Sequence, residues 1–341
     1  MELRHATSLS PSAMKKSLLS LVIQMICVAG FPQSLPLNGG IHFQRTNLVV
    51  RWKAPKHPWP KTLGVYQMVP TKYSPTVISN LMALGPFTDK DKTDRGTNGM
   101  SFSNTGGHLE ISFTMGEIEY ARHTRDYSPT DLAQGVPPTN QLFQLTTNFL
   151  PKLGISLSEI SKGINGRTKI NAFEPFMEYF RNGVGVTNIE WRGVGFRRAV
   201  DGVEFFYDDG HGGIDFGEHS QVVKIILSWP DLKRDNFYSA APPKKIIQWI
   251  CEGRARQKHM LRLDGGETMI DWATVKSLTI TKATAYYHGE LSHGEYATNS
   301  VFANCVWPYA DLWGMVDTGT TNVEVAIDCP IVDETKPLKT E

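Results

Sequence analysis

The chain has 341 residues, of which 40% are hydrophobic, and its 35 Lys and Arg nearly balance its 34 Asp and Glu. This composition is ordinary for a globular protein and is sufficient for a large core. The net charge of +1 gives no reason to expect a polyanionic partner such as a nucleic acid.

The first feature along the chain is an expected signal peptide over residues 1–30. Lys15 and Lys16 precede an apolar run, Leu18–Ala29, that is too short to span a bilayer and ends in small residues. This order is typical of a cleavable secretory signal rather than of a membrane anchor. We therefore expect a secreted, periplasmic or cell-envelope protein with no integral membrane segment after cleavage.

Residues 31–155 predict a first α+β unit. Its expected elements are a strand at 48–52, a helix at 74–85, a loop at 88–104, a hairpin at 108–122 and a helix ending near 151. Ser74 suits the cap of the first helix, and Pro75 suits its first turn. Pro151 should end or kink the second helix.

Residues 156–330 predict a second α+β region with a related order of elements. A hairpin opened by Gly212 and Gly213 precedes Pro242–Pro243 and a helix, as in 106–153. A strand at 277–287 and a last hairpin, 301–316 with 322–328, complete the region, and 331–341 are expected to be a flexible tail. The predicted class is α+β, with tandem units of antiparallel hairpin sheets and helices packed on one face.

This layout resembles the PepSY-like superfamily and the extracytoplasmic regulatory proteins of the YycH and YycI type. The residues that carry the resemblance are Val203–Phe206, Val222–Trp229 and the helix after Pro243, within a pattern that covers about 70–330. The resemblance implies an inhibitory or sensory module that binds an envelope protein or peptide. The chain departs from YycH and YycI in its apparently cleavable signal, because those proteins keep a membrane helix.

Three cysteines follow the signal. Cys305 and Cys329 lie in neighbouring strand-like segments, which makes them the candidate disulfide pair of an exported protein. Cys251 falls on the apolar face of a predicted helix and is expected to be a buried free thiol.

Two clusters are candidate binding sites. Trp307, Tyr309 and Trp313 could form an aromatic platform for a partner, although core packing explains the same residues. The repeated His-Gly-Glu triplets offer a metal-ligand set, with an exposed polar loop as the alternative. The four candidate metal ligands are His288, Glu290, His293 and Glu295.

Catalytic motifs are weak. The sequence Val316–Gly319 is similar to the Asp-Thr-Gly loop of aspartic proteases, but no second copy supplies the other aspartate. We therefore expect Asp317 to be a turn residue. No phosphate loop, dinucleotide fingerprint or serine elbow is present, so no cofactor is expected.

These observations favour an exported, non-catalytic protein that binds a protein or peptide, by strand addition or in a groove. A secreted hydrolase acting on glycan or peptide, or a metal-binding module, remain the alternatives.

Overall fold

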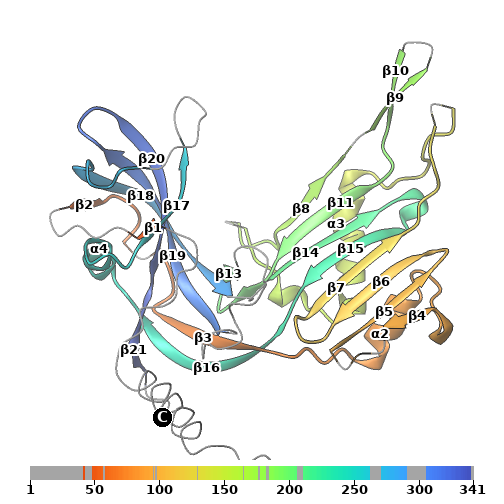
Figure 1. Cartoon of the computed structure of the whole chain (residues 1–341), viewed down its shortest axis with the longest axis horizontal. Coiled ribbons are helices and arrows are strands. Elements are labelled where there is room, and N and C mark those ends of the chain that lie inside the picture. Colours follow the sequence, from red (N-terminus) through yellow and green to blue (C-terminus); the bar gives the residue numbers. More distant parts are fainter. Residues whose placement is uncertain are drawn as a thin grey trace, which may run out of the picture. The chain divides into compact units, whose positions relative to one another are not determined.

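The computed structural model describes residues 41–42, 48–56, 58–94, 96, 98–128, 130–163, 165–175, 177–181, 184–205, 210–261, 270–289 and 305–338. The expected signal peptide lies outside the described residues. The α+β class is confirmed, but strands greatly outnumber helices. The strands form open sheets rather than a regular alternation of hairpins and helices (Figure 1).

One sheet has eight strands, and all of its pairs are antiparallel. Its order is β4 (Lys92–Asp94), β5 (Gly99–Asn104), β6 (Gly107–Ser112), β7 (Glu117–Arg122), β15 (Val222–Ser228), β14 (His211–Phe216), β11 (Arg192–Arg197) and β8 (Ile170–Phe173). The predicted loop at 88–104 was wrong, because it contains β4 and β5. A separate ribbon, β9 (Met177–Arg181) with β10 (Val184–Asn188), lies between β8 and β11 in the chain.

Alternation of apolar and polar residues gives the eight-stranded sheet one core face. In β6, Leu109 and Ile111 are buried, whereas His108 and Glu110 on the opposite face are not. Two helices, α2 (Pro75–Met82) and α3 (Thr139–Phe149), contribute side chains to the same hydrophobic cluster. These two helices therefore cover one face of the sheet, and no described helix lies on its other face (Figure 1).

Local signals explain where α2 and its neighbours begin and end. Ser74 caps α2 as predicted, because its hydroxyl accepts a hydrogen bond from the Val77 N–H at 3.2 Å. Pro151 falls in the 3₁₀ turn η2 (Leu150–Leu153), which directly follows α3. Short 3₁₀ turns also occur at η1 (Asp89–Asp91), η3 (Leu157–Glu159) and η5 (Glu218–Ser220).

The other large sheet has eleven strands. Its main path is β1 (Ile41–His42), β17 (Arg256–Leu261), β20 (Asn322–Pro330), β19 (Cys305–Asp317), β18 (Ser277–Gly289), β13 (Val203–Phe205) and β12 (Ala199–Val200). The branches are β2 (Val49–Trp52), β3 (Thr62–Val69), β16 (Asp231–Ala240) and β21 (Val332–Pro337). Helix α4 (Pro243–Cys251) packs against β2 and β20. Residues 332–337 are therefore a paired strand and not the flexible tail that was expected.

Asp201, in the turn between β12 and β13, forms hydrogen bonds with residues of β3 and β18. Its carboxylate accepts hydrogen bonds from the hydroxyls of Tyr66 and Tyr287, at 2.5 and 3.2 Å, and from the Gly64 N–H. Arg234 adds an ion pair at 3.3 Å. Burial, followed by the hydrogen bond to Asp201, raises the pKa of Tyr66 to about 12. The cluster joins several strands of one sheet.

The predicted repeat is only half present. Both hairpins form, as β6–β7 and β14–β15, and Ile118 and Ile225 of these hairpins are buried in the core. The two hairpins pair with each other in one sheet through β7 and β15, but α3 packs on that sheet and α4 on the other. Each large sheet also takes strands from both sides of residue 155.

The expected Cys305–Cys329 disulfide does not form, because the register of β19 and β20 separates the two residues. Ala310 lies opposite Cys329, while Cys305 lies opposite Gln67 of β3. Five residues of strand separate Ala310 from Cys305, which is about 17 Å, and a disulfide needs Cα atoms within about 7 Å. None of the three cysteines among the described residues forms a disulfide, and Cys251 is half-buried on α4.

Within the described ranges, no helix combines the length and the apolar character that crossing a membrane requires.

Candidate functional site: an exposed sheet edge with a basic pocket

Strand β8 is an exposed edge of the eight-stranded sheet. It pairs with β11 on one side, and no described strand pairs with its other side. Asn171, Ala172 and Phe173 are all exposed. Because an edge strand directs alternate N–H and C=O groups away from the sheet, β8 offers unpaired main-chain donors and acceptors to another strand.

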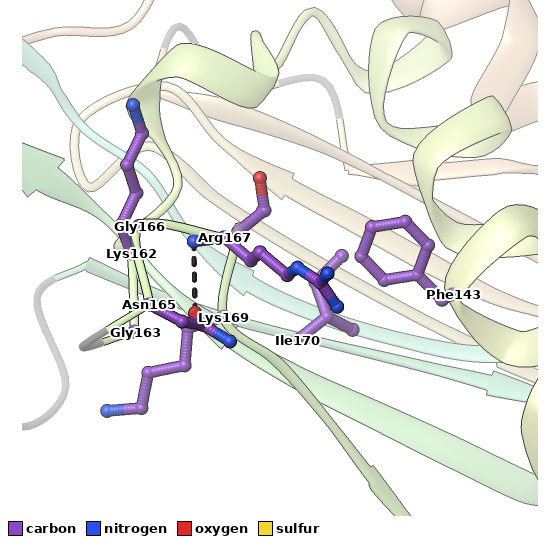
Figure 2. Close-up of a pocket in the computed structure, with 9 residues that line it drawn as sticks. Phe143, Lys162, Gly163, Asn165, Gly166, Arg167, Lys169 and Ile170 are labelled. Atoms are coloured by element: carbon purple, nitrogen blue, oxygen red, sulfur yellow. Dashed lines mark hydrogen bonds between the residues drawn. The ribbon is translucent and has the colours of Figure 1, made fainter.

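A basic loop leads into β8 and forms a pocket with α3. Lys162 and Thr168 make an isolated antiparallel bridge, and the chain turns between them at Gly163 and Gly166. The pocket has a volume of about 810 Å³. Its lining residues are Phe143, Lys162, Gly163, Asn165, Gly166, Arg167, Thr168, Lys169 and Ile170 (Figure 2).

Local hydrogen bonds shape this loop. The Asn165 side chain accepts a hydrogen bond from the Arg167 N–H at 3.1 Å, and the Gly166 N–H donates to the Gly163 carbonyl. Gly166 has φ +73°, a left-handed conformation that glycine adopts without strain. Figure 2 shows the Arg167 side chain running toward Ile170 and Phe143. Phe143 is 51% exposed, so the pocket also presents an aromatic surface.

The pocket carries an excess of positive charge. Lys169 and Arg197 both lie within ion-pair distance of one carboxylate, that of Glu204, at 3.1 and 3.6 Å. Among the described residues, no carboxylate comes within ion-pair distance of Lys162 or Arg167. The arrangement therefore suits a ligand that brings carboxylates or other anions.

The other end of β8 is aromatic. Phe173 is 45% exposed and packs edge-to-face against Trp191, with ring centroids 5.8 Å apart. Next to Phe173, the Glu174 carboxylate accepts a hydrogen bond from the Arg192 guanidinium in an ion pair. This hydrogen bond lowers the pKa of Glu174. The edge thus has basic groups at one end and an apolar contact surface at the other.

The aromatic residues proposed from the sequence lie elsewhere, in β19. Trp307 and Tyr309 are 8% and 2% exposed, whereas Trp313 is half-buried and donates its indole N–H to Asp311 at 3.1 Å. The burial of Trp307 and Tyr309 favours packing in the core, which was the alternative to a partner-binding platform. A role for these residues in partner binding stays a prediction.

The candidate metal site falls mostly outside the described residues. His288 lies half-buried in β18, with its ring edge-to-face against Tyr309. Glu290, His293 and Glu295 are not described, so the geometry of the four ligands stays a prediction. In the part of the chain that is described, no group of three potential ligands gathers around a common point.

Asp317 is a turn residue, as the sequence predicted. It ends β19, and its side chain accepts a hydrogen bond from the Gly319 N–H at 2.6 Å. Gly319 has φ +88° in the turn that leads to β20.

The basic pocket was missed in the sequence, although a local signal exists. Lys162, Arg167 and Lys169 cluster around a Gly-Ile-Asn-Gly turn. What the sequence does not indicate is that β8 is an edge, because this depends on the order of strands from distant segments.

No protein-family model matches the chain, and no match was found among curated proteins. A solved structure of an uncharacterized protein from Eubacterium rectale is similar with a TM-score of 0.44 and 9% sequence identity, over 86% of this chain and 89% of that chain. This similarity is too low to inform the function. The resemblance to PepSY-like proteins stays a prediction.

Proposed function

We propose that this chain is a non-catalytic binding protein that takes up an extended, acid-rich segment of a partner protein along β8. The observation that carries the proposal is an exposed edge strand preceded by a basic loop. In that loop, no carboxylate of a described residue forms an ion pair with Lys162 or Arg167. In strand addition, main-chain hydrogen bonds supply affinity and alternate side chains supply specificity. If the chain is exported, as residues 1–30 predict, the partner is an envelope or secreted protein.

The dimensions of the edge suit a short segment. The four residues of β8 extend over about 14 Å, which matches about four residues of an added strand. Acidic residues at the start of that segment would lie near Lys162 and Arg167, and an apolar residue at its other end would contact Phe173. Charge complementarity also speeds diffusional encounter and makes it dependent on salt.

The alternative of a hydrolase has less support. Glu174 and Glu204 are each held by a basic side chain rather than placed opposite a second carboxylate. Acid–base hydrolysis of glycans requires two carboxyl groups that flank the scissile bond.

A peptide-binding measurement tests the proposal. The probe is a blocked, fluorescent peptide of alternating Val and Glu, and the reference is the same peptide with Lys in place of Glu. We expect fluorescence anisotropy to show tighter binding of the acidic peptide, which weakens as salt rises. The double variant Lys162→Glu, Arg167→Glu should weaken that binding at least about tenfold, which is about 1.4 kcal/mol.

A matched control separates local charge from net charge. Lys53, which follows β2, and Lys282, in β18, are exposed lysines far from β8 in the chain, and reversing both changes the net charge by the same amount. This variant should bind the acidic peptide like the native protein. Lysines near an edge strand can also simply prevent edge-to-edge aggregation. If charge reversal in the basic loop caused self-association but left peptide binding unchanged, the proposal would be wrong.

A further inference from the structure

On the face of the eight-stranded sheet opposite its helices, three glycines lie together near β8. These are Gly193, Gly195 and Gly213, and we call them the glycine floor. The registers of β8, β11, β14 and β15 place two rows of residues on this face. The first row is Phe173, Gly193, Asp215 and Lys224, and the second is Asn171, Gly195, Gly213 and Ile226. Three of these eight positions are glycine, at the centre of the two rows.

Two of the glycines leave open space above the sheet. A Cβ at Gly195 would have only the Gly212 carbonyl oxygen near it, at 4.0 Å, and one at Gly213 only the Val194 carbonyl oxygen, at 3.6 Å. No side chain of a described residue therefore comes within 4 Å of either Cβ position. The exposed side chain of Ile226 lies beside Gly213 in the same row.

Asp215 borders the glycine floor without a partner for its carboxylate. The residue is only 7% exposed. A Cβ at Gly193 would collide with both the Asp215 Oδ1 atom and the Phe173 ring, so both side chains lean over that glycine. Within the described part of the chain, no hydrogen bond or ion pair reaches the Asp215 carboxylate, although Lys224 on the next strand attracts it electrostatically.

A mostly buried carboxylate without a hydrogen bond is costly, so a ligand that donates one to Asp215 would be favoured there. The Phe173 ring lies beside Asp215 over Gly193, and that ring packs edge-to-face against Trp191 with centroids 5.8 Å apart. A carboxylate next to aromatic rings is the combination that attracts an ammonium or guanidinium group. The bare glycines next to Asp215 leave room for the chain that carries such a group.

We propose that Asp215, with the floor formed by Gly195 and Gly213, binds a cationic group, either a primary ammonium or a guanidinium, on a slender chain. This site shares Phe173 with the proposed strand addition at β8 but differs from it in place and charge, because it lies on a face of the sheet and selects a cation. The source of the cation could be a free amine or a Lys or Arg side chain of a partner.

Binding of small blocked amino acids to the full chain tests the site. The probes are Nα-acetyl-arginine amide and Nα-acetyl-lysine amide, with Nα-acetyl-norleucine amide as the neutral control. We expect the two cationic probes, and not the neutral one, to shift the amide NMR signals of Gly193, Gly195 and Gly213. A Lys- and Arg-containing peptide that binds at least about tenfold more tightly than the blocked residues would identify a protein as the source; equal affinities would identify a free amine.

Two substitutions test the site in different ways. Asp215→Asn removes the charge, and Gly195→Val fills the floor where a Cβ has room, so both should fold and both should lose at least about tenfold in affinity. Ser103→Val, on β5 at the far side of the sheet, is the matched control and should bind normally. The proposal is overturned if the cationic probes cause no shifts up to millimolar concentrations, or if the shifts persist in Asp215→Asn.

Discussion

Among single residues, Asp215 makes a clear prediction about stability and pH. Burial raises the pKa of this carboxyl to about 6 from its ordinary value of 3.8. The folded chain therefore holds the proton more tightly than the unfolded chain, so this residue's contribution to stability falls as pH rises from about 4 to 6. Above pH 6 both states are ionised, and the cost levels off at no more than about 2 kcal/mol, because solvent screens part of the charge.

We expect Asp215→Asn to stabilise the protein at pH 7 by up to that amount and to have little effect at pH 4. Urea unfolding of both proteins at the two pH values measures the difference. An equal effect at both pH values would show that the carboxyl titrates normally. A stabilising substitution that also abolishes cation binding would be the pattern expected of a functional site that costs stability.

A second residue-scale prediction concerns the buried ion pair between Arg256 and Asp328, which lie opposite each other in β17 and β20. Their side chains approach to 3.1 Å, and Asp328 is fully buried. Arg256→Met leaves that carboxylate without its cation and should destabilise the chain by about 3–5 kcal/mol. Denaturant unfolding checks the value, and the added change Asp328→Leu should recover much of it, because the uncompensated charge is then gone.

At the scale of elements, the cap of α2 gives a smaller prediction. Ser74→Ala removes the acceptor for the Val77 N–H and should cost about 1 kcal/mol. Ser74→Asn, which keeps an acceptor, should cost less. A thermal unfolding series of the three proteins checks this order, and an unchanged midpoint for Ser74→Ala would mean that water replaces the cap without loss.

Elements with strong local signals were predicted well. The cap and proline of α2, and the alternation in β6 and β7, are local patterns that match the observed elements. β5 was missed because Met100 and Phe102 alternate with serines in a largely polar stretch. The partner of each helix could not be predicted, because α3 and α4 follow similar hairpins yet pack on different sheets.

At the scale of the whole molecule, long-range strand order limits what the sequence can predict. β7 pairs with β15 across about a hundred residues of chain. β8 is an edge because it pairs only with β11, whose other side pairs with β14. The basic residues of the candidate site were readable, but their position at an unpaired edge was not. The cysteines show the same limit, since neighbouring strands held Cys305 and Cys329 yet their register separated them.

The last prediction concerns export, which stays a proposal based on residues 15–30. A basic start, a short apolar run and small residues at Val28–Gly30 match the requirements of a signal peptidase. We expect the mature protein to begin between Gly30 and Pro36 when the full chain is expressed in a secreting host. N-terminal sequencing of the protein from the medium or periplasm measures this directly. An intact Met1 or Met14 on protein that stays in the cytoplasm would contradict it, and would move the expected partner of the β8 edge to that compartment.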